Sequence, residues 1–478
     1  MVDKKRKVLT NLIWRFAERM GAKLVAFIVS VVLARILSPE EYGTVALVSV
    51  FITLFQVFVD SGLGNALIQK KETDNLDFST VFFTNIVFCF VLYIILFFTS
   101  PLIASFYNNP SLTIYIRVLG LTLIISGVKN VQQAYVSKKL IFKKFFFATL
   151  IGTIIAAIVG ILMALKGFGI WALIAQQLVN LFFDTLILWL TVKWRPNLIF
   201  SFERLSILFS YGWKILVSSF IDTLYNDITQ LIIGKQYSKS DLAFYNKGNQ
   251  MPNLLVTNIN NSIDSVLLPT LSKEQDNLEN VRRMTRRAIK TSMYIMAPLM
   301  IGLAFTSNTI IRLLLTDKWL ETVPYLCIFC IAYMFYPIHT ANLNAIKSLG
   351  RSDIFLKLEI IKKIIGSILL VVSMFIGVRA IAYSILINSI IAQFINSWPN
   401  KKLIGYGYIQ QLKDILPSLL LAVFMGIIVY FINYIPIPLI AIFIIQVVVG
   451  GLIYIVGSKI FKVDSYSFII DLMRGDKK

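Results

Sequence analysis

Cysteine, histidine and charged residues are scarce in this chain of 478 residues. Three cysteines and one histidine are too few for a disulfide scaffold or for a structural zinc site, which needs about four ligands. Cys327 and Cys330 form one C-x-x-C pair with no second pair, so we interpret them as small apolar helix residues. We therefore expect neither a metal ion nor a cofactor.

Soluble domains and ATP-binding motifs are missing too. Charged residues make up 15% of the chain and hydrophobic residues 57%, with a mean hydropathy of +0.76, which leaves no room for a sizeable soluble domain. No Gly-x-x-x-x-Gly-Lys-Ser/Thr loop occurs, so we do not expect this chain to hydrolyse ATP.

The hydrophobic residues form about fourteen blocks, each close to the roughly 20 residues that a helix needs to cross a bilayer. Backbone polar groups inside a membrane must be paired within closed elements, so the predicted fold class is an all-α integral membrane protein with about 14 transmembrane helices. The expected spans are 10–37, 42–68, 79–104, 111–134, 145–165, 168–192, 207–233, 242–271, 289–311, 321–346, 354–376, 381–398, 415–433 and 437–458.

The gaps between these blocks alternate between basic and non-basic. The gaps on one side, together with both chain ends, hold 30 lysines and arginines, and the gaps on the other side hold six. Because basic loops stay on the cytoplasmic side, this bias predicts a multi-pass protein with both termini in the cytoplasm. The bias also explains most of the net charge of +21, and because these charges lie in short loops we do not expect nucleic acid as a partner.

The chain repeats weakly at an interval of about 200 residues. Residues 38–43 (SPEEYG) face residues 238–243 (SKSDLA), and residues 60–62 (DSG) face residues 260–262 (NNS). Each half would hold six spans that enter from the same side, which predicts two pseudo-symmetric six-helix lobes around a central cavity. The expected division is 1–204 for the N-terminal lobe, 205–400 for the C-terminal lobe, and 401–478 for two additional helices and a cytoplasmic tail.

Several segments carry a specific resemblance. Residues 33–43, LARILSPEEYG, are similar to the signature at the end of the first helix in Wzx-type polysaccharide flippases. Residues 60–64 (DSGLG) resemble the end of the second helix in that family, and residues 212–214, 231–234 and 242–245 resemble its seventh-helix region. Those flippases form the polysaccharide transporter family of the MOP superfamily, which also includes MurJ lipid II flippases and MATE drug exporters. Ala243 departs from the pattern, because the second-half copy often has glycine there.

The resemblance implies a MurJ/MATE-like fold and a flippase that is not an enzyme. Its substrate would be a polyprenyl-diphosphate-linked oligosaccharide, moved by alternating access across the bacterial cytoplasmic (inner) membrane for O-antigen, lipopolysaccharide or exopolysaccharide biosynthesis. The partners would be this lipid-linked oligosaccharide and membrane lipids. A coupling cation or proton and the polysaccharide polymerase machinery are further partners that the resemblance leaves open.

Basic residues inside the first span predict a diphosphate site. Arg15, Arg19 and Lys23 recur every four residues and therefore share one stripe of the helix, with Glu18 one residue off it. A charge at the bilayer centre costs about 2.5–3.5 kcal/mol on insertion scales, so such residues need a partner or water. Clustered guanidinium and ammonium groups suit phosphate oxygens. The alternative is that these side chains extend to the lipid headgroups.

Polar stripes on the seventh and eighth spans predict a glycan surface. Amide, hydroxyl and carboxylate groups at membrane depth would be unsatisfied against lipid tails, so they should face each other, water or sugar hydroxyls. Hydrogen bonding between packed helices is an equally good interpretation. The candidate substrate-binding residues here are Asp222, Asn226, Asn253, Thr257, Asn260 and Asp264.

Three further residues are candidates for coupling transport to a cation or proton. Asp60 and Asp227 are carboxylates within expected spans, and His339 is the one histidine of the chain, with a side chain that titrates near neutral pH. The alternative for each of them is a purely structural role.

Two other function classes compete with a flippase. A drug or cation antiporter of the same superfamily would favour an acidic cavity, whereas the first span here supplies cations. A membrane glycan polymerase or lipid-linked glycosyltransferase usually has a large outer loop or an Asp-x-Asp metal site, and the sequence contains neither.

Overall fold

The computed structural model describes residues 21, 23–60 and 62–474. Within this part of the chain the secondary structure is helical, beginning with a helix over residues 23–36. The helices that follow are α2 (Pro39–Asp60), α3 (Leu63–Gln69), α4 (Asn75–Phe106), α5 (Leu112–Lys139), α6 (Lys143–Leu165), α7 (Ile170–Thr191), α8 (Phe202–Gln236), α9 (Lys239–Lys273), α10 (Leu278–Phe305), α11 (Ser307–Leu315), α12 (Thr322–Met334), α13 (Tyr336–Ser348), α14 (Ser352–Ser373), α15 (Val378–Leu403), α16 (Tyr408–Phe431), α17 (Leu439–Ile460) and α18 (Asp464–Arg474).

Eleven helical segments in the described residues are long and apolar enough to cross a membrane. This confirms the expected class of helical membrane protein. Of the other three expected spans, the first begins outside the described residues, and the eighth and eleventh correspond to α9 and α14. Both of these helices are long enough, but each carries several amide or charged side chains along its length. The count of fourteen spans therefore stays a prediction.

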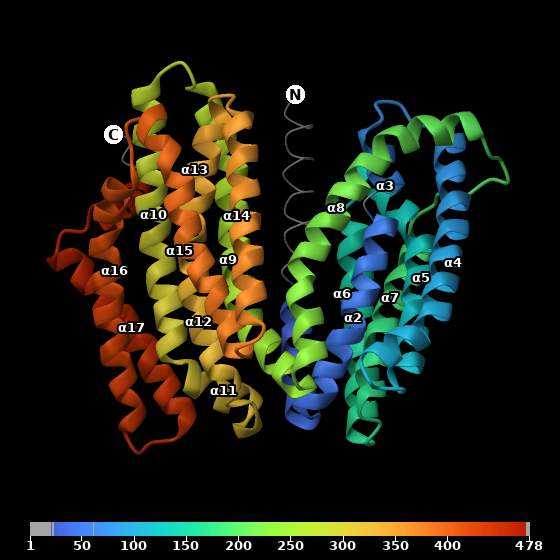
Figure 1. Cartoon of the computed structure of the whole chain (residues 1–478), viewed down its shortest axis with the longest axis horizontal. Helices are drawn as coiled ribbons and strands as arrows, with labels where there is room; N and C mark the ends of the chain where they lie inside the picture. Colours follow the sequence, from blue (N-terminus) through green and yellow to red (C-terminus); the bar gives the residue numbers. More distant parts are fainter. Residues whose placement is uncertain (1–20, 22, 61, 475–478) are drawn as a thin grey trace. The chain divides into compact units, whose positions relative to one another are not determined.

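The chain divides into two compact units, one up to Ala243 and one from Phe244 onward. In the first unit, α4 packs along α5 and α6 along α7, while α8 lies against α2, α3 and α4 (Figure 1). In the second unit, α10 packs against α12, α13 and α16, and α15 against α12 and α14. The lobe boundaries expected from the sequence repeat, after residues 204 and 400, stay predictions.

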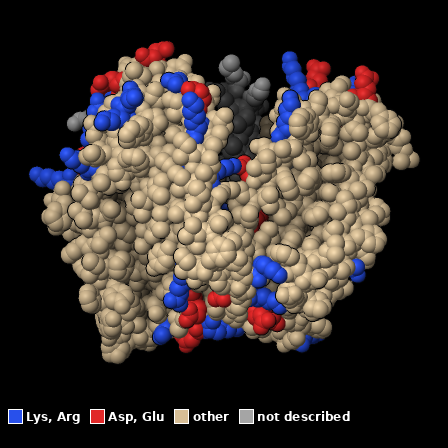
Figure 2. Space-filling model, in the orientation of Figure 1, with Lys and Arg blue, Asp and Glu red and all other residues tan. Residues whose placement is uncertain are grey.

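On the face drawn in Figure 2, each unit carries most of its charge at the ends of the helices. Lysine, arginine and acidic side chains gather there, and the flanks between are almost free of charge on the face drawn in Figure 2. Among the basic residues, Lys70 pairs with the buried carboxylate of Asp77 at 2.7 Å. The Lys138 ammonium donates to the backbone carbonyls of Leu67, Ile68 and Lys70 at the end of α3. A cation at a helix C-terminus stabilises the unpaired carbonyls there.

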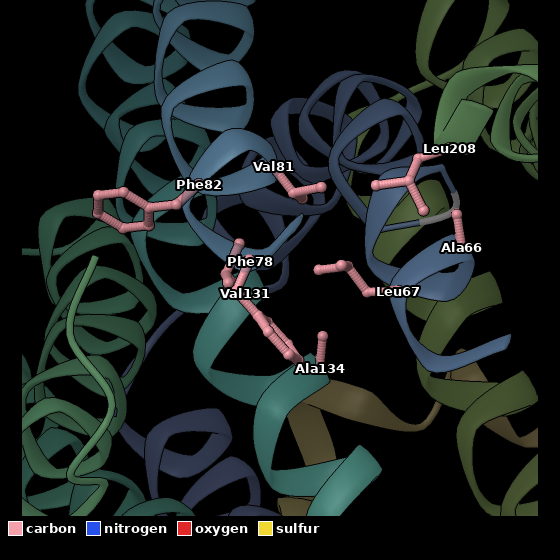
Figure 3. Packing of buried hydrophobic residues seen from close by; sticks show 8 residues of the cluster. All are labelled: Ala66, Leu67, Phe78, Val81, Phe82, Val131, Ala134 and Leu208. Carbon is pink, nitrogen blue, oxygen red and sulfur yellow. The ribbon is translucent and has the colours of Figure 1, made fainter. Parts of the chain in front are cut away.

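A buried apolar cluster joins four helices of the first unit at this basic end (Figure 3). Ala66 and Leu67 of α3 meet Phe78 of α4, and the aromatic ring of Tyr135 packs edge-on against Phe78 with centroids 5.5 Å apart. The remaining buried members are Val81, Phe82, Val131, Ala134 and Leu208. The cluster therefore holds the short helix α3 in place next to α5, where the candidate site lies.

The two copies of the expected repeat begin with the same local structure. The Ser38 hydroxyl donates to the Glu41 carboxylate at 2.9 Å, and the backbone N–H of Glu41 donates back to that hydroxyl. Ser238 and Asp241 form the same reciprocal pair, with the hydroxyl 2.6 Å from the carboxylate. Each pair is a capping box that starts a helix, α2 in one copy and α9 in the other.

The glycine after the first capping box, Gly43, has a steric reason. A Cβ at Gly43 would lie 1.7 Å from the backbone carbonyl oxygen of Lys239, so any side chain there would push the starts of α2 and α9 apart. Ala243, the equivalent residue in the second copy, is buried and tolerates its methyl group.

Candidate functional site

A polar cavity of about 520 Å³ lies within the first unit. The end of α2 contributes Gln56 and Asp60, and α3 contributes Gly64 and Asn65. The wall opposite comes from α5, with smaller contributions from α6 and α7. Its further lining residues are Ile68, Ser126, Lys129, Asn130, Gln133, Ala134, Ser137, Phe145 and Leu181. A cavity so rich in amide and charged groups, set among apolar helices, accommodates water or a polar ligand rather than a lipid tail.

Asp60 is the carboxylate of this cavity. It is the last residue of α2, and its side chain is exposed to the cavity. The Gln56 amide donates to one carboxylate oxygen at 3.1 Å, and the Asn130 amide donates to the other at 3.3 Å. The same Asn130 amide also donates to the backbone carbonyl of Val59 at 3.2 Å. Asp60 is thus oriented by neutral amides and keeps acceptor capacity for a cation or proton.

An ion pair closes the cavity on the side of α5 and α7. The Lys129 ammonium lies 2.6 Å from a carboxylate oxygen of Asp184, and the two side chains are only 13% and 7% exposed. Breaking such a buried pair by removing one partner typically costs about 3–5 kcal/mol, because the other charge is left uncompensated. Lys129 therefore contributes a fixed positive charge next to Asp60, and Asp184 holds it in place.

Three glycines in the segments that resemble the flippase family allow the close contacts around Asp60. A Cβ on Gly64 would lie 2.5 Å from the Asn130 side-chain oxygen, so glycine is needed for the amide that orients Asp60. Gly62 marks the break between α2 and α3, and α8 approaches it closely: a Cβ on Gly212 would lie 3.0 Å from the Gly62 backbone. The motifs 60–64 and 212–214 therefore shape the cavity and the packing of α8 beside it.

The predicted glycan residues of α8 belong to the first unit. Asp222 and Asn226 are both exposed, and only Leu208, Gly212 and Ile233 are buried along the whole of α8. Asp227 is half-buried one residue further on and accepts a hydrogen bond from the Gln230 amide at 2.9 Å. This local bond satisfies part of the Asp227 carboxylate.

The predicted glycan residues of α9 belong to the second unit. Asn253, Thr257 and Asp264 are exposed, and the Thr257 hydroxyl donates to the Asn253 side-chain oxygen at 3.1 Å. Asn260 is half-buried, and its side-chain oxygen has no hydrogen-bond partner among the described residues. Because burying an unpaired amide oxygen is unfavourable, this stretch of α9 is suited to contact water or a hydroxyl-bearing ligand.

The predicted diphosphate site is described only in part. Arg15 and Arg19 lie outside the described residues. Lys23 is exposed on the described helical stretch over residues 23–36. The role of these three residues in substrate binding stays a prediction.

His339 lies in a polar setting within the second unit. Its Nδ1 is 3.3 Å from the Asn396 amide and its Nε2 is 3.5 Å from the Ser389 hydroxyl, so both ring nitrogens have neutral neighbours. On α14, the Lys362 ammonium pairs with Glu359 at 2.6 Å. These contacts fit a structural histidine at least as well as a coupling residue.

Sequence reasoning did not assign the cavity that contains Asp60, because its partners come from distant segments. Lys129 and Asp184 are a basic and an acidic residue within the fourth and sixth expected spans, and opposite charges at membrane depth are a usable signal for pairing. Asn130 and Gln133 had no such signal, since amides occur on many helices of this chain.

Comparison with known proteins places this geometry in a family. The model of the polysaccharide biosynthesis protein family matches residues 32–324, which is more than half of the chain. The chain belongs to this family. The match begins in the first expected span and includes the capping box at Ser38, the cavity around Asp60 and all of α8 and α9.

Individual members of the family are distant relatives. The chain is 25% identical over 417 residues to the lipopolysaccharide biosynthesis protein WzxC of Escherichia coli K12, covering 83% of each chain. It is 23% identical over 321 residues to the succinoglycan biosynthesis transport protein ExoT of Rhizobium meliloti, covering 67% of this chain and 65% of ExoT. The alignment thus spans slightly less than two thirds of ExoT.

The fold of this family member is that of a known flippase structure. The inward closed conformation of the lipid II flippase MurJ superposes with a TM-score of 0.74 at 18% identity, covering 95% of this chain and 99% of MurJ. The MurJ-like architecture expected from the sequence is therefore confirmed.

Proposed function

We propose that this protein is a flippase that moves polyprenyl-diphosphate-linked oligosaccharide repeat units across the bacterial cytoplasmic membrane. The observation that carries the proposal is the family match over residues 32–324, joined to a fold shared with MurJ. WzxC and ExoT are named for polysaccharide biosynthesis and MurJ for flipping a lipid-linked precursor. The exposed polar side chains of α8 and α9 suit a cargo with many hydroxyl groups.

The cargo binds through two kinds of contact in this proposal. Its diphosphate docks on Arg19 and Lys23, with Arg15 guiding entry, because charge-assisted hydrogen bonds to phosphate are the strongest available there. Its sugars lie against the polar faces of α8 and α9, whose candidate residues are Asp222, Asn226, Asn253, Thr257, Asn260 and Asp264. The prenyl tail stays in lipid. The chain moves this cargo without making or breaking a covalent bond.

Asp60 is the coupling residue that we favour over Asp227 and His339. Its side chain is exposed to a 520 Å³ polar cavity, whereas the side chains of Asp227 and His339 are half-buried. A cation or proton that binds Asp60 changes the charge beside the Lys129–Asp184 pair, and this would bias one conformation of the transporter over another. The ion dependence of transport by an Asp60→Asn variant tests this assignment.

The proposed orientation follows the distribution of basic loops, with both termini in the cytoplasm. The charge at the helix ends of each unit is compatible with it. In this orientation the substrate enters from the cytoplasmic face, where lipid-linked repeat units are assembled, and leaves toward the polysaccharide polymerase machinery outside.

A deletion of the gene in its own host tests the proposal. We expect loss of the surface polysaccharide and accumulation of lipid-linked repeat units, with unchanged resistance to cationic drugs. The wild-type gene should restore the polysaccharide, and Lys23→Ala should not, because it removes a phosphate ligand. Lys139→Ala is the matched control, since Lys139 is an exposed lysine at the end of α5 and should restore export fully.

One result would contradict the flippase assignment, and another would contradict only the diphosphate site. Loss of drug resistance with intact polysaccharide export would identify a drug antiporter. The other result is normal export by the Lys23→Ala variant at wild-type protein level in the membrane. That result would exclude Lys23 as a diphosphate ligand, and the deletion phenotype alone would then test the flippase assignment.

A further inference from the structure

A second polar pocket lies in the second unit, between α10 and the C-terminal helix α18. It has a volume of about 280 Å³. Helix α10 lines it with Arg283, Arg286, Arg287 and Lys290, which are spaced so that they share one face of the helix. Helix α18 contributes Asp464, Ser465 and Phe468. Four cations therefore face one carboxylate.

Two of the four cations are already paired. The Arg286 guanidinium makes a two-pronged contact with Asp414 of α16, with both nitrogen–oxygen distances at 2.7 Å. The Lys290 ammonium lies 2.5 Å from the Asp464 carboxylate and so ties α18 to α10. These pairs fix the frame of the pocket.

The other two cations keep their charge uncompensated. Arg283 donates one hydrogen bond to the side-chain oxygen of Asn280 at 2.9 Å, and the Arg287 guanidinium lies over the Phe468 ring at 4.2 Å. Neither arginine forms an ion pair with an acidic residue of the described chain. Arginine has five N–H donors in a planar fork, so both retain donors for an oxyanion. Both side chains are exposed, so a ligand can reach them.

The surroundings indicate where this oxyanion comes from. Ile460 and Phe461, immediately before α18, are 67% and 73% exposed, and Ile469 and Ile470 of α18 are half-buried. An amphipathic helix that follows an apolar membrane helix, with large apolar side chains beside a basic pocket, is typical of a segment at the membrane surface. A phosphate group presented there by a lipid would have its acyl chains next to Ile460 and Phe461.

We propose that this pocket binds the phosphate of an anionic phospholipid through Arg283 and Arg287. The bound phosphodiester, with one negative charge, lies between two exposed arginines, lowers their uncompensated charge and fastens α18 to α10. The site is separate from the cargo path proposed above, and it acts on the stability of the second unit. Basic pockets between membrane helices are known to hold lipid headgroups of this chemistry.

Thermal unfolding of the purified full-length protein with added lipid tests the proposal. Phosphatidylglycerol should raise the melting temperature, whereas phosphatidylcholine should not. Each basic residue near an anionic lipid surface contributes enough that its loss weakens binding about fivefold, so Arg283→Gln/Arg287→Gln should weaken phosphatidylglycerol binding roughly 30-fold. An Arg287→Lys variant keeps the charge without the planar fork and should retain part of the affinity.

A matched double variant distinguishes lipid binding in this pocket from general electrostatic attraction between the basic protein and anionic lipid. Lys402 and Lys413 are exposed lysines of the second unit near the start of α16, and Lys402→Gln/Lys413→Gln removes the same charge. This control should keep the wild-type response. An equal loss in the control would overturn the proposal, and so would an undiminished response of the arginine variant. Inorganic phosphate that stabilises the protein as much as the lipid would identify a site for a soluble anion instead.

Discussion

Asp60 and Lys129 show how a polar residue is kept inside an apolar helix bundle. The Asp60 carboxylate receives amide hydrogen bonds from Gln56 and Asn130, and Lys129 is matched by Asp184. The two arrangements differ in their access to solvent. The ion pair is almost closed to solvent, whereas Asp60 opens into the cavity. A residue that has to bind and release an ion needs this kind of access.

Asp60→Asn should remove the ion dependence of transport. Asparagine keeps the shape and one acceptor oxygen but cannot carry a charge or take up a proton, so a cation or proton gradient would no longer accelerate export. The measurement is export rate in vesicles with and without an imposed sodium or proton gradient. Asp276→Asn is the matched control, because Asp276 is an exposed carboxylate in the turn before α10. Gradient dependence that survives in Asp60→Asn would exclude Asp60 as the coupling residue.

Helix α4 begins at a capping box that makes its stability depend on pH. The backbone N–H of Asp77 donates to the Asp74 carboxylate at 2.9 Å and, assisted by the nearby Arg204 charge, holds the pKa of Asp74 below its usual value. A carboxyl group with a lowered pKa in the folded state adds stability at every pH above its usual pKa of about 3.9. This contribution disappears as the pH falls through the lowered pKa.

Replacing Asp74 with alanine should therefore destabilise the protein by about 1 kcal/mol at neutral pH, the usual loss for an N-cap residue. The difference from wild type should shrink once the pH falls below the lowered pKa. Thermal unfolding in detergent between neutral and acidic pH measures it. Asp74→Asn is the control, because asparagine caps helices without titrating: its loss at neutral pH should be smaller than that of Asp74→Ala, and the difference between these two variants should not change with pH. A loss in Asp74→Ala that stays constant down to acidic pH would show that the charge of Asp74 adds nothing.

The helices could be predicted because each one depends on a local pattern of hydrophobic residues in the sequence. Hydrophobic blocks of membrane-spanning length anticipated eleven helical segments, and Ser38 and Ser238, which the repeat aligns, both begin capping boxes in the structure. The expected span 42–68 continued through residues 60–63, where α2 ends and α3 begins, although residues 60–64 resemble the end of the family's second helix. At this position Gly62 and Gly212, which are 150 positions apart, approach each other closely.

The candidate site was predictable only residue by residue. Asp60 stood out because a carboxylate within a span is expensive, and the polar stripes of α8 and α9 stood out by helical spacing. Which residues meet Asp60 was not readable, since Asn130 comes from another helix about 70 residues away. Contacts of this kind follow from which helices are neighbours, and that is a property of the packed unit.

At the scale of the whole molecule, we propose that this family member carries a lipid-linked oligosaccharide from one leaflet to the other. Family membership, the fold shared with MurJ and the exposed polar side chains of α8 and α9 are the grounds for it. An enzyme with the same substrate would change the covalent structure of that lipid, and a flippase would not. Leaflet location and chemical identity of the lipid therefore have to be measured together.

Reconstitution of the purified protein into liposomes with repeat-unit lipid from the deletion strain makes that measurement. A membrane-impermeant oxidant that attacks sugars reports which leaflet holds the glycan. Our account predicts that the lipid initially protected in the inner leaflet becomes reactive when the protein is present, and that recovered lipid is chemically unchanged. Protection equal to that of protein-free liposomes, or conversion of the lipid into a longer glycan, would contradict it.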